Sequence, residues 1–409
     1  MSGLELPVSC ALIAGAGLYY AVARHIDRCK IKVISSETAR SNNSKAPVAK
    51  DNVGNAGAII RDHCPSLTNP EQAYMVPTPY LYGGMVQTVY STAITTKRDN
   101  GSDVRYEREA KVLSDGGTVS LDWYPSRPTD KETQQPIVVL LPGVGGSSYE
   151  YHIRSTAKTL SSVGPTGSCT VVVMNHRGAS RTPLTSPKLY NAYDTTDYRD
   201  IVQYVCECFP DAPLVGVGYS LGANLLTKYL GEQGGNSRLV GAAAICCPFD
   251  TEIAGKALDK RGFLNDRVFQ PNLMATLKRL LKRNIDVFKT KYSDSEVEAI
   301  MRATRMSQID DIVTAKAYGH KDCWEYYRAA SSTAYVDDIR TPFLAINTED
   351  DPITPYEGVP IEKFETNQHI ALVLAKHGGH LGMFTGIRPT IWYLRPVAEF
   401  LDAVLRSKE

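Results

Sequence analysis

The pentapeptide Gly-Tyr-Ser-Leu-Gly at residues 218–222 constrains this chain more than any other stretch. An apolar run at 214–217 precedes it, and residues 223–230 have the composition of a helix. A strand, a sharp turn with a serine between two glycines, and a helix make a nucleophile elbow, which holds the serine hydroxyl above a sheet. The helix N-terminus then points its N–H groups at negative charge that develops there. We therefore predict that Ser220 is a nucleophile, with a purely structural glycine turn as the alternative.

Two nucleotide-binding interpretations of the glycines fail. A dinucleotide-binding turn needs G-x-G-x-x-G, and Leu221 stands where the third glycine would follow Gly216 and Gly218. The glycine-rich stretch at 143–146 lacks the Gly-Lys-Ser/Thr ending of a phosphate-binding loop.

A serine nucleophile needs a base, and the base needs an acid that orients it. In chains with such an elbow the order is Ser, then Asp or Glu, then His. Four histidines follow the elbow: His320, His369, His377 and His380. We favour His380, because it lies on a glycine-rich segment just after the apolar run 370–375. His377 is the alternative base, and His369 opens the strand as a structural or surface residue.

The orienting acid is expected at the C-terminal end of a parallel strand, where sites form in open α/β sheets. Residues 341–347 read as such a strand, and Asp350 and Asp351 follow it. We favour Asp351, because it directly precedes Pro352 at the turn. Asp250, which follows the strand after the elbow, is the runner-up.

Two backbone N–H groups are expected to bind the oxyanion. One belongs to Leu221, the residue after the nucleophile, and the other to a loop after an earlier strand. The apolar strand 137–141 runs into the loop 142–148, where Gly143 lets the backbone turn inward. Val144 is therefore the second predicted donor, and a plain strand-to-helix loop is the alternative.

Further motifs follow one another in order from about residue 74 to the C-terminus. They are Gly-x-x-Gln-Thr at 84–88, Asp-Gly-Gly with Leu-Asp-Trp at 115–123, Asn-His-Arg-Gly at 175–178, an acidic segment at 194–200 and His-Leu-Gly-Met-Phe at 380–384. In this order they resemble the YheT-like α/β-hydrolases, close to the α/β-hydrolase-domain 1 and 3 proteins and to the fungal medium-chain fatty-acid ethyl ester synthase/esterases. The resemblance implies Ser220 as nucleophile, Asp351 as acid and His380 as base. One departure is Pro142-Gly143, where many relatives have His-Gly.

The resemblance also implies the fold. We expect an α/β-hydrolase domain over 74–409, with a mostly parallel central sheet flanked by helices and a helical lid at about 251–340, inserted after the sixth strand. Within the lid, residues 273–283 form a cationic amphipathic pattern. Such a helix contacts anionic lipid or an acyl-CoA phosphate, or it has a solvated face over a packed one.

Composition excludes some classes of protein. A net charge of +1 gives no field that would attract nucleic acid. The nine cysteines are scattered and odd in number, which favours reduced thiols over a disulfide framework. Serine hydrolysis requires no metal and no organic cofactor, and we expect neither.

The N-terminus differs from the rest of the chain. Residues 6–23 carry no charge and just reach the length that a membrane-spanning helix needs. Basic residues follow the run, which predicts a single-pass anchor over 1–32 with the catalytic domain facing the cytosol. A signal peptide is disfavoured because no Lys or Arg precedes the run, and a buried or surface helix is the third possibility. The Ser-, Asn- and Pro-containing residues 33–73 read as a linker.

These features predict a membrane-tethered serine hydrolase of carboxylic esters, acting on lipids or medium-chain acyl esters through an acyl-enzyme. One alternative is an acyltransferase that uses the same serine to move an acyl group from acyl-CoA to an alcohol. The other is a hydrolase fold kept for interaction without catalysis.

Overall fold

The computed structural model describes residues 29–43, 54–95 and 103–407 of the 409. Within these residues nine strands form one sheet, in the order β1-β9-β8-β7-β6-β4-β5-β3-β2. The strands are β1 (Lys32–Ser35), β2 (Glu107–Val112), β3 (Thr118–Tyr124), β4 (Ile137–Leu141), β5 (Thr170–Asn175), β6 (Leu214–Tyr219), β7 (Leu239–Ile245), β8 (Phe343–Thr348) and β9 (Ile370–Ala375). The strands β4 to β9 run parallel, whereas β1, β2 and β3 pair antiparallel with their neighbours.

The central strands are continuous apolar runs because helices cover both faces of the sheet. Every residue of β4, β6, β8 and β9 is buried. Within β4, Val138 and Leu140 pack toward one face, and Ile137 and Val139 toward the other, as the period of two requires.

Helices α3 (Ala56–His63), α6 (Tyr151–Leu160) and α16 (Leu394–Arg406) cover the first face, and α7 (Thr196–Cys208) and α8 (Leu221–Gln233) the second. The remaining helical and strand segments outside the insertion are α2 (Ser36–Asn43), α4 (Pro65–Thr68), η1 (Pro79–Leu81), α5 (Gly84–Thr95), η2 (Gly234–Asn236), η6 (Tyr356–Gly358), α15 (Ile361–Thr366), β10 (Phe384–Thr385) and β11 (Thr390–Ile391). The predicted fold class, a mostly parallel sheet flanked by helices, is confirmed.

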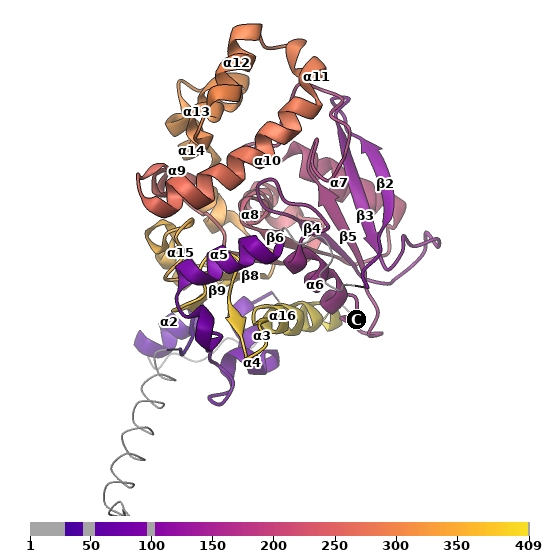
Figure 1. Cartoon of the computed structure of the whole chain (residues 1–409). Helices are drawn as coiled ribbons and strands as arrows, with labels where there is room; N and C mark the ends of the chain where they lie inside the picture. Colours follow the sequence, from indigo (N-terminus) through magenta and orange to yellow (C-terminus); the bar gives the residue numbers. More distant parts are fainter. Residues whose placement is uncertain (1–28, 44–53, 96–102, 408–409) are drawn as a thin grey trace, which may run out of the picture.

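A helical insertion separates β7 from β8 and rises above the sheet, as Figure 1 shows in orange. It comprises α9 (Thr251–Asp259), η3 (Asn265–Phe269), α10 (Gln270–Arg283), α11 (Ile285–Lys289), α12 (Asp294–Arg302), α13 (Met306–Asp310), η4 (Asp311–Ala315), α14 (Cys323–Ala330) and η5 (Ser332–Asp338). Its own apolar core includes Leu277, Leu281, Phe288 and Ile300. The insertion lies where the sequence predicts a lid, and β7 is the sixth strand when the count starts at β2.

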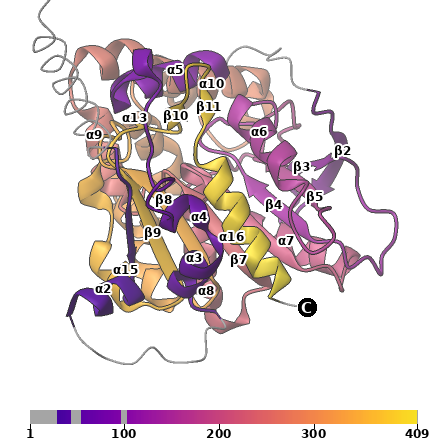
Figure 2. The ribbon, with the colours of Figure 1, turned by 90° about the horizontal axis from the view of Figure 1, so that it is seen from below.

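The predicted linker over 33–73 is wrong for its described residues. Strand β1 pairs antiparallel with the edge strand β9, with Val33 opposite Val373. Figure 2 shows α3 and α4 beside α16, and the side chains of Ile60 and Leu67 are buried there. The backbone N–H and Oγ of Ser66 donate to Glu399 at 3.0 and 2.6 Å. Polar residues dominate this segment in the sequence, but its few spaced apolar residues complete the core.

The predicted membrane anchor is also corrected. Its charge-free run, 6–23, lies outside the residues that the structure describes. No helix among the described residues is both long and apolar enough to cross a membrane. This finding conflicts with the predicted single-pass localisation. Residues 29–32, which the prediction assigned to the anchor segment, belong to the folded domain: Cys29 is buried and Lys32 begins β1.

Candidate active site

Ser220 occupies a strained turn between β6 and α8. Its φ of 51° and ψ of −116° are uncommon for a residue with a side chain. The N–H of Ser220 donates to the carbonyl of Ile245 at 3.0 Å, which ties the turn to β7. A Cβ on Gly218 would lie 2.5 Å from the carbonyl oxygen of Gly222, and one on Gly222 would lie 2.4 Å from that of Leu141. Both positions therefore require glycine, because neighbouring backbone atoms approach too closely to leave room for a side chain.

The structure brings the three residues singled out in the sequence into one hydrogen-bonded chain. The Oγ of Ser220 lies 2.9 Å from Nε2 of His380, and Nδ1 of the same ring lies 2.8 Å from Oδ2 of Asp351. The Asp351 side chain is fully buried and that of His380 is 8% exposed. This geometry can pass a proton from the hydroxyl to the ring while the carboxylate fixes the ring's tautomer.

Asp351 is held by its own turn. Its Oδ1 accepts from the N–H groups of Ile353 and Thr354, both at 2.8 Å, and its Oδ2 accepts from the Thr354 hydroxyl at 2.7 Å. The carboxylate therefore presents Oδ2 to His380 from a fixed position.

The alternative acids and bases lie elsewhere. Asp350 contacts Nδ1 of His377 at 3.2 Å and accepts from the N–H groups of Gly84 and Gly379. Asp250 caps the N-terminus of α9 by accepting from Ile253. These residues organise loops around the site without reaching Ser220. Of the other two histidines, His369 contacts the Gly54 carbonyl and His320 packs its ring against Tyr193.

Helix α5 supports the loop that carries His380. The Thr88 hydroxyl oxygen accepts from the N–H of His380 at 2.8 Å, and Oε1 of Gln87 accepts from the N–H of Phe384 at 2.6 Å. The Ser91 hydroxyl donates to the Leu381 carbonyl at 2.9 Å. Only the family motif at 84–88 pointed to this helix, because nothing local in the sequence links it to a loop almost three hundred residues away.

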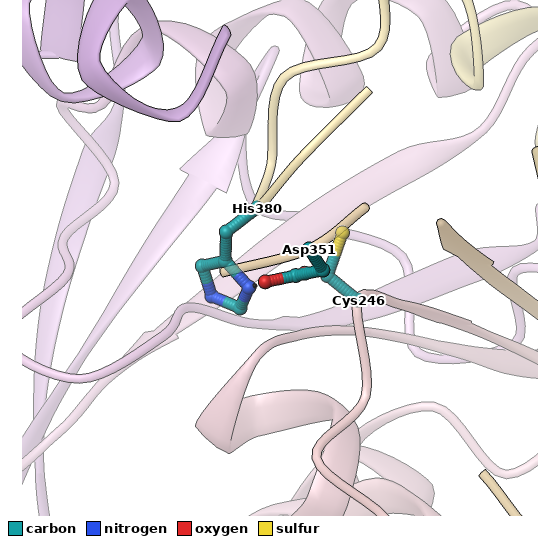
Figure 3. Close-up of side chains that lie close together, drawn as sticks. All are labelled: Cys246, Asp351 and His380. Carbon is teal, nitrogen blue, oxygen red and sulfur yellow. Dashed lines mark hydrogen bonds and ion pairs between the residues drawn. The ribbon is translucent and has the colours of Figure 1, made fainter. Parts of the chain in front are cut away.

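Cys246, which the sequence analysis did not connect with the site, lies directly beside Asp351 and His380 (Figure 3). Its sulfur, an Asp351 carboxylate oxygen and a His380 ring nitrogen all lie within 4.8 Å of one another. Cysteine, aspartate and histidine are a donor set that zinc accepts. Here, however, both ring nitrogens of His380 are engaged with Asp351 and Ser220. Burial, reinforced by the Asp351 carboxylate, raises the pKa of the Cys246 thiol well above its usual value. The protonated thiol accepts from the N–H of Leu381 at 3.3 Å, so the cluster fits a packed support for the histidine loop better than a metal site.

The loop 142–148 lies directly against Ser220. A Cβ on Gly143 would lie 3.2 Å from the Ser220 Cβ. Leu221 is the first residue of α8, where a helix leaves backbone N–H groups without a partner inside the helix. Val144 packs against the apolar cluster that contains Leu221. The two predicted oxyanion donors are thus neighbours beside the serine, and their role stays a prediction.

A buried polar network fixes this loop and explains two of the family motifs. The Ser148 N–H donates to Oδ1 of Asn175 at 2.9 Å, and the Ser148 hydroxyl donates to Asp122. The amide of Asn175 donates to Asp122 at 2.8 Å, and Arg108 forms a two-pronged ion pair with the same carboxylate. The side chain of Asp122 is fully buried, and a charge buried there is stabilised only because every oxygen is paired.

Arg177 connects the same two motifs to a third, the acidic segment at 194–200. It is 1% exposed and pairs with Asp197 at 2.6 Å and with Asp115 at 2.8 Å. The Asp-Gly-Gly turn, the Asn-His-Arg-Gly loop and the first turn of α7 therefore meet at one guanidinium. A Cβ on Gly117 would lie 1.7 Å from that guanidinium, which explains the second glycine of the turn.

Comparison with known proteins agrees with this architecture. The family described as alpha/beta hydrolase fold matches residues 136–387. Phospholipase ABHD3 of Homo sapiens is 30% identical over 85% of this chain and 82% of its own length. Embryogenesis-associated protein EMB8 of Picea glauca is 30% identical over 75% of this chain and 67% of its own. Medium-chain fatty acid ethyl ester synthase/esterase 2 of Saccharomyces cerevisiae is 30% identical over 83% and 87%. These matches confirm the resemblance carried by the motifs, and the chain belongs to the α/β-hydrolase family.

Proposed function

We propose that this protein is a serine hydrolase that cleaves carboxylic esters of lipids or medium-chain acyl groups through an acyl-enzyme on Ser220. The observation that carries the proposal is the hydrogen-bonded chain from Ser220 through His380 to Asp351. The names of the relatives, a phospholipase and an ethyl ester synthase/esterase, support an ester substrate.

In the first half of the reaction the Ser220 oxygen attacks the ester carbonyl while Nε2 of His380 takes the hydroxyl proton. Asp351 stabilises the imidazolium that results, and the N–H groups of Val144 and Leu221 bind the oxyanion. The C–O bond to the alcohol then breaks, and the alcohol leaves with the proton from His380. The acyl group remains on Ser220.

In the second half, water attacks the acyl-enzyme. His380 takes a proton from the water, the carbonyl–Oγ bond breaks, and the same proton returns to Ser220. The products are a carboxylic acid and the free enzyme, and every proton moves through the one ring.

Transfer to an alcohol is the second candidate activity, because the yeast relative is named a synthase as well as an esterase. If an alcohol replaces water at the acyl-enzyme, the product is a new ester. The acyl donor is then another ester or an acyl-CoA, and Ser220 serves both reactions.

One experiment tests the proposal and separates the two activities. The purified full chain is given 4-nitrophenyl decanoate with and without ethanol, and acid and ethyl ester are quantified. Hydrolysis predicts decanoic acid as the main product in both cases, whereas transfer predicts that ethyl decanoate dominates when ethanol is present. Absence of both products would refute the proposal, provided that the protein is folded by circular dichroism.

A further inference from the structure

A cavity of about 560 Å³ lies between the oxyanion loop, the loop after β5 and the lid helix α10. Four arginines line it: Arg154 from α6, Arg181 from the loop after β5, and Arg279 and Arg283 from α10. Among its lining residues, all within the described part of the chain, Glu150 is the only carboxylate. The cationic face that the sequence predicts for 273–283 thus turns in part toward a cleft that is open to solvent on one side.

One lining residue of the cavity lies close to Ser220. Gly145 lines it and stands two residues after Gly143, which packs against Ser220. Two residues span at most about 7 Å of extended chain. Helix α10 closes the other side: a Cβ on Gly145 would lie 2.7 Å from Thr276, and one on Gly178 would lie 3.0 Å from Leu280.

Three of the four arginines keep a positive charge that no carboxylate of the described residues neutralises by an ion pair. Arg181, Arg279 and Arg283 form no ion pair with any carboxylate in the described ranges. Nε of Arg279 donates to the Ala275 carbonyl, and Arg283 donates to the Gly178 carbonyl at 2.5 Å, so both charges remain. Burial raises the pKa of Glu150 to about 7, so a fraction of this carboxyl is protonated at neutral pH.

We propose that this cavity binds a phosphate group attached to the substrate, so that the enzyme prefers phosphate-bearing esters to neutral esters with the same acyl chain. The inference rests on the proposed ester hydrolysis at Ser220. Arginine guanidinium groups bind phosphate oxygens in pairs. A cleft lined by one sign of charge also concentrates ligands of the opposite sign.

Two kinds of acyl substrate that carry phosphate are relevant here, the oxygen esters of glycerolipids and the thioester acyl-CoA. In a glycerolipid a few bonds of glycerol separate the phosphate from the ester carbonyl, whereas in acyl-CoA the long pantetheine arm separates the two groups. The cavity lies within one short loop of Ser220, so we assign it to the headgroup phosphate of a glycerolipid.

A matched pair of substrates tests the assignment. Decanoyl-glycerol 3-phosphate and monodecanoylglycerol differ only in the phosphate, and both are assayed with the full chain below their aggregation concentrations. Arg181→Gln and Arg279→Gln should each lower kcat/KM for the phosphate ester roughly tenfold or more. Neither should change kcat/KM for the neutral ester by more than about twofold, and Arg279→Lys should recover part of the loss.

Lys282→Gln is the matched control, because it removes one positive charge from the same helix at an exposed residue outside the cavity lining. It should leave both substrates unchanged. Equal loss on both substrates in the arginine variants, or no loss on either, would overturn the proposal.

A binding measurement keeps this inference separate from the proposed function. Calorimetry on the full chain carrying Ser220→Ala needs no turnover, so it reports on the cavity even if ester hydrolysis is not observed. Glycerol 3-phosphate should bind, and Arg181→Gln should weaken that binding. If coenzyme A alone binds and depends on Arg181, the headgroup assignment is overturned in favour of acyl-CoA. If neither ligand binds, the phosphate site is overturned altogether.

Discussion

The backbone N–H of His380 donates to the hydroxyl oxygen of Thr88, which lies 292 residues earlier in the chain, at a distance of 2.8 Å. The Thr88 hydroxyl in turn donates to the Gly84 carbonyl at 2.7 Å, so it is fixed by its own helix. Both groups are buried. The position of the proposed catalytic base is therefore set by a helix that precedes the first long strands of the domain.

We predict that Thr88→Val lowers kcat/KM about tenfold, because a valine of nearly the same shape leaves the buried N–H of His380 without an acceptor. Thr88→Ser keeps the hydroxyl and should stay close to the parent. Steady-state kinetics on 4-nitrophenyl decanoate, with thermal unfolding of each variant, provides the measurement. Equal activities of the valine and serine variants would show that this hydrogen bond does not position the loop.

Substitutions of the three candidate acids should affect different properties of the protein, either turnover or stability. Asp351→Asn should reduce turnover by about four orders of magnitude, since an amide cannot stabilise the imidazolium. Asp350→Asn should mainly lower stability, by about 1–3 kcal/mol, because it weakens contacts with Gly84 and Gly379. Asp250→Asn should be nearly neutral, since asparagine also caps helices well. Kinetics and urea unfolding of the three variants would contradict this order if the largest loss of turnover fell on Asp350 or Asp250.

Much of the site was predictable because its chemistry is encoded locally. The glycines around Ser220 predict a tight turn, because a side chain at either position would clash with the backbone. The acid and the histidine each follow an apolar run that predicts a strand. The parts that were missed depend on distant partners. Strand β1 is four residues long, and what makes it a strand is the free edge of β9 more than three hundred residues away.

The same limit applies to the arginine cavity. The cationic helix at 273–283 is visible in the sequence, whereas Arg154 and Arg181 stand on separate segments with no local sign of a shared site. Only the packing of α10 on the two loops brings the four side chains together.

Glu150 should make stability depend on pH. Burial raises its folded-state pKa to about 7 from the ordinary value of 4.5, so between these values the folded state holds more protons than the unfolded chain. Stability attributable to this group is therefore lost as the pH rises from about 4.5 to about 7. The pKa of His152, 3.5 Å away, is lowered to about 3 by its burial and by His380, so His152 stays neutral across this window.

Glu150→Gln replaces the carboxyl with an amide that does not ionise, so the variant does not lose this stability as the pH rises. Relative to the parent, the variant should gain about 2 kcal/mol of unfolding free energy between pH 5 and pH 8. Urea unfolding of both proteins at the two pH values measures the change. The raised pKa of Glu150 would be contradicted if the difference in unfolding free energy between variant and parent were the same at both pH values. It would also be contradicted if the parent gained stability relative to the variant at the higher pH.

Cys246 should be unreactive in the native protein. Its side chain is fully buried and its thiol pKa is raised, so little thiolate forms and no reagent reaches it. Native protein treated with iodoacetamide at pH 7.5 should keep its esterase activity, and peptide mapping should find Cys246 unmodified. Alkylation of Cys246 together with loss of activity would show that the histidine loop opens readily.

In the proposed reaction the acyl group is carried on the oxygen of Ser220. Intact-mass and peptide analysis after brief reaction of the full chain with a fluorophosphonate gives the most direct test. We predict one adduct, located on Ser220, with complete loss of activity. The matched variants Ser220→Ala and Ser147→Ala should respectively abolish and preserve that adduct. An adduct on another residue, or esterase activity in Ser220→Ala above a tenth of the parent's, would contradict the account.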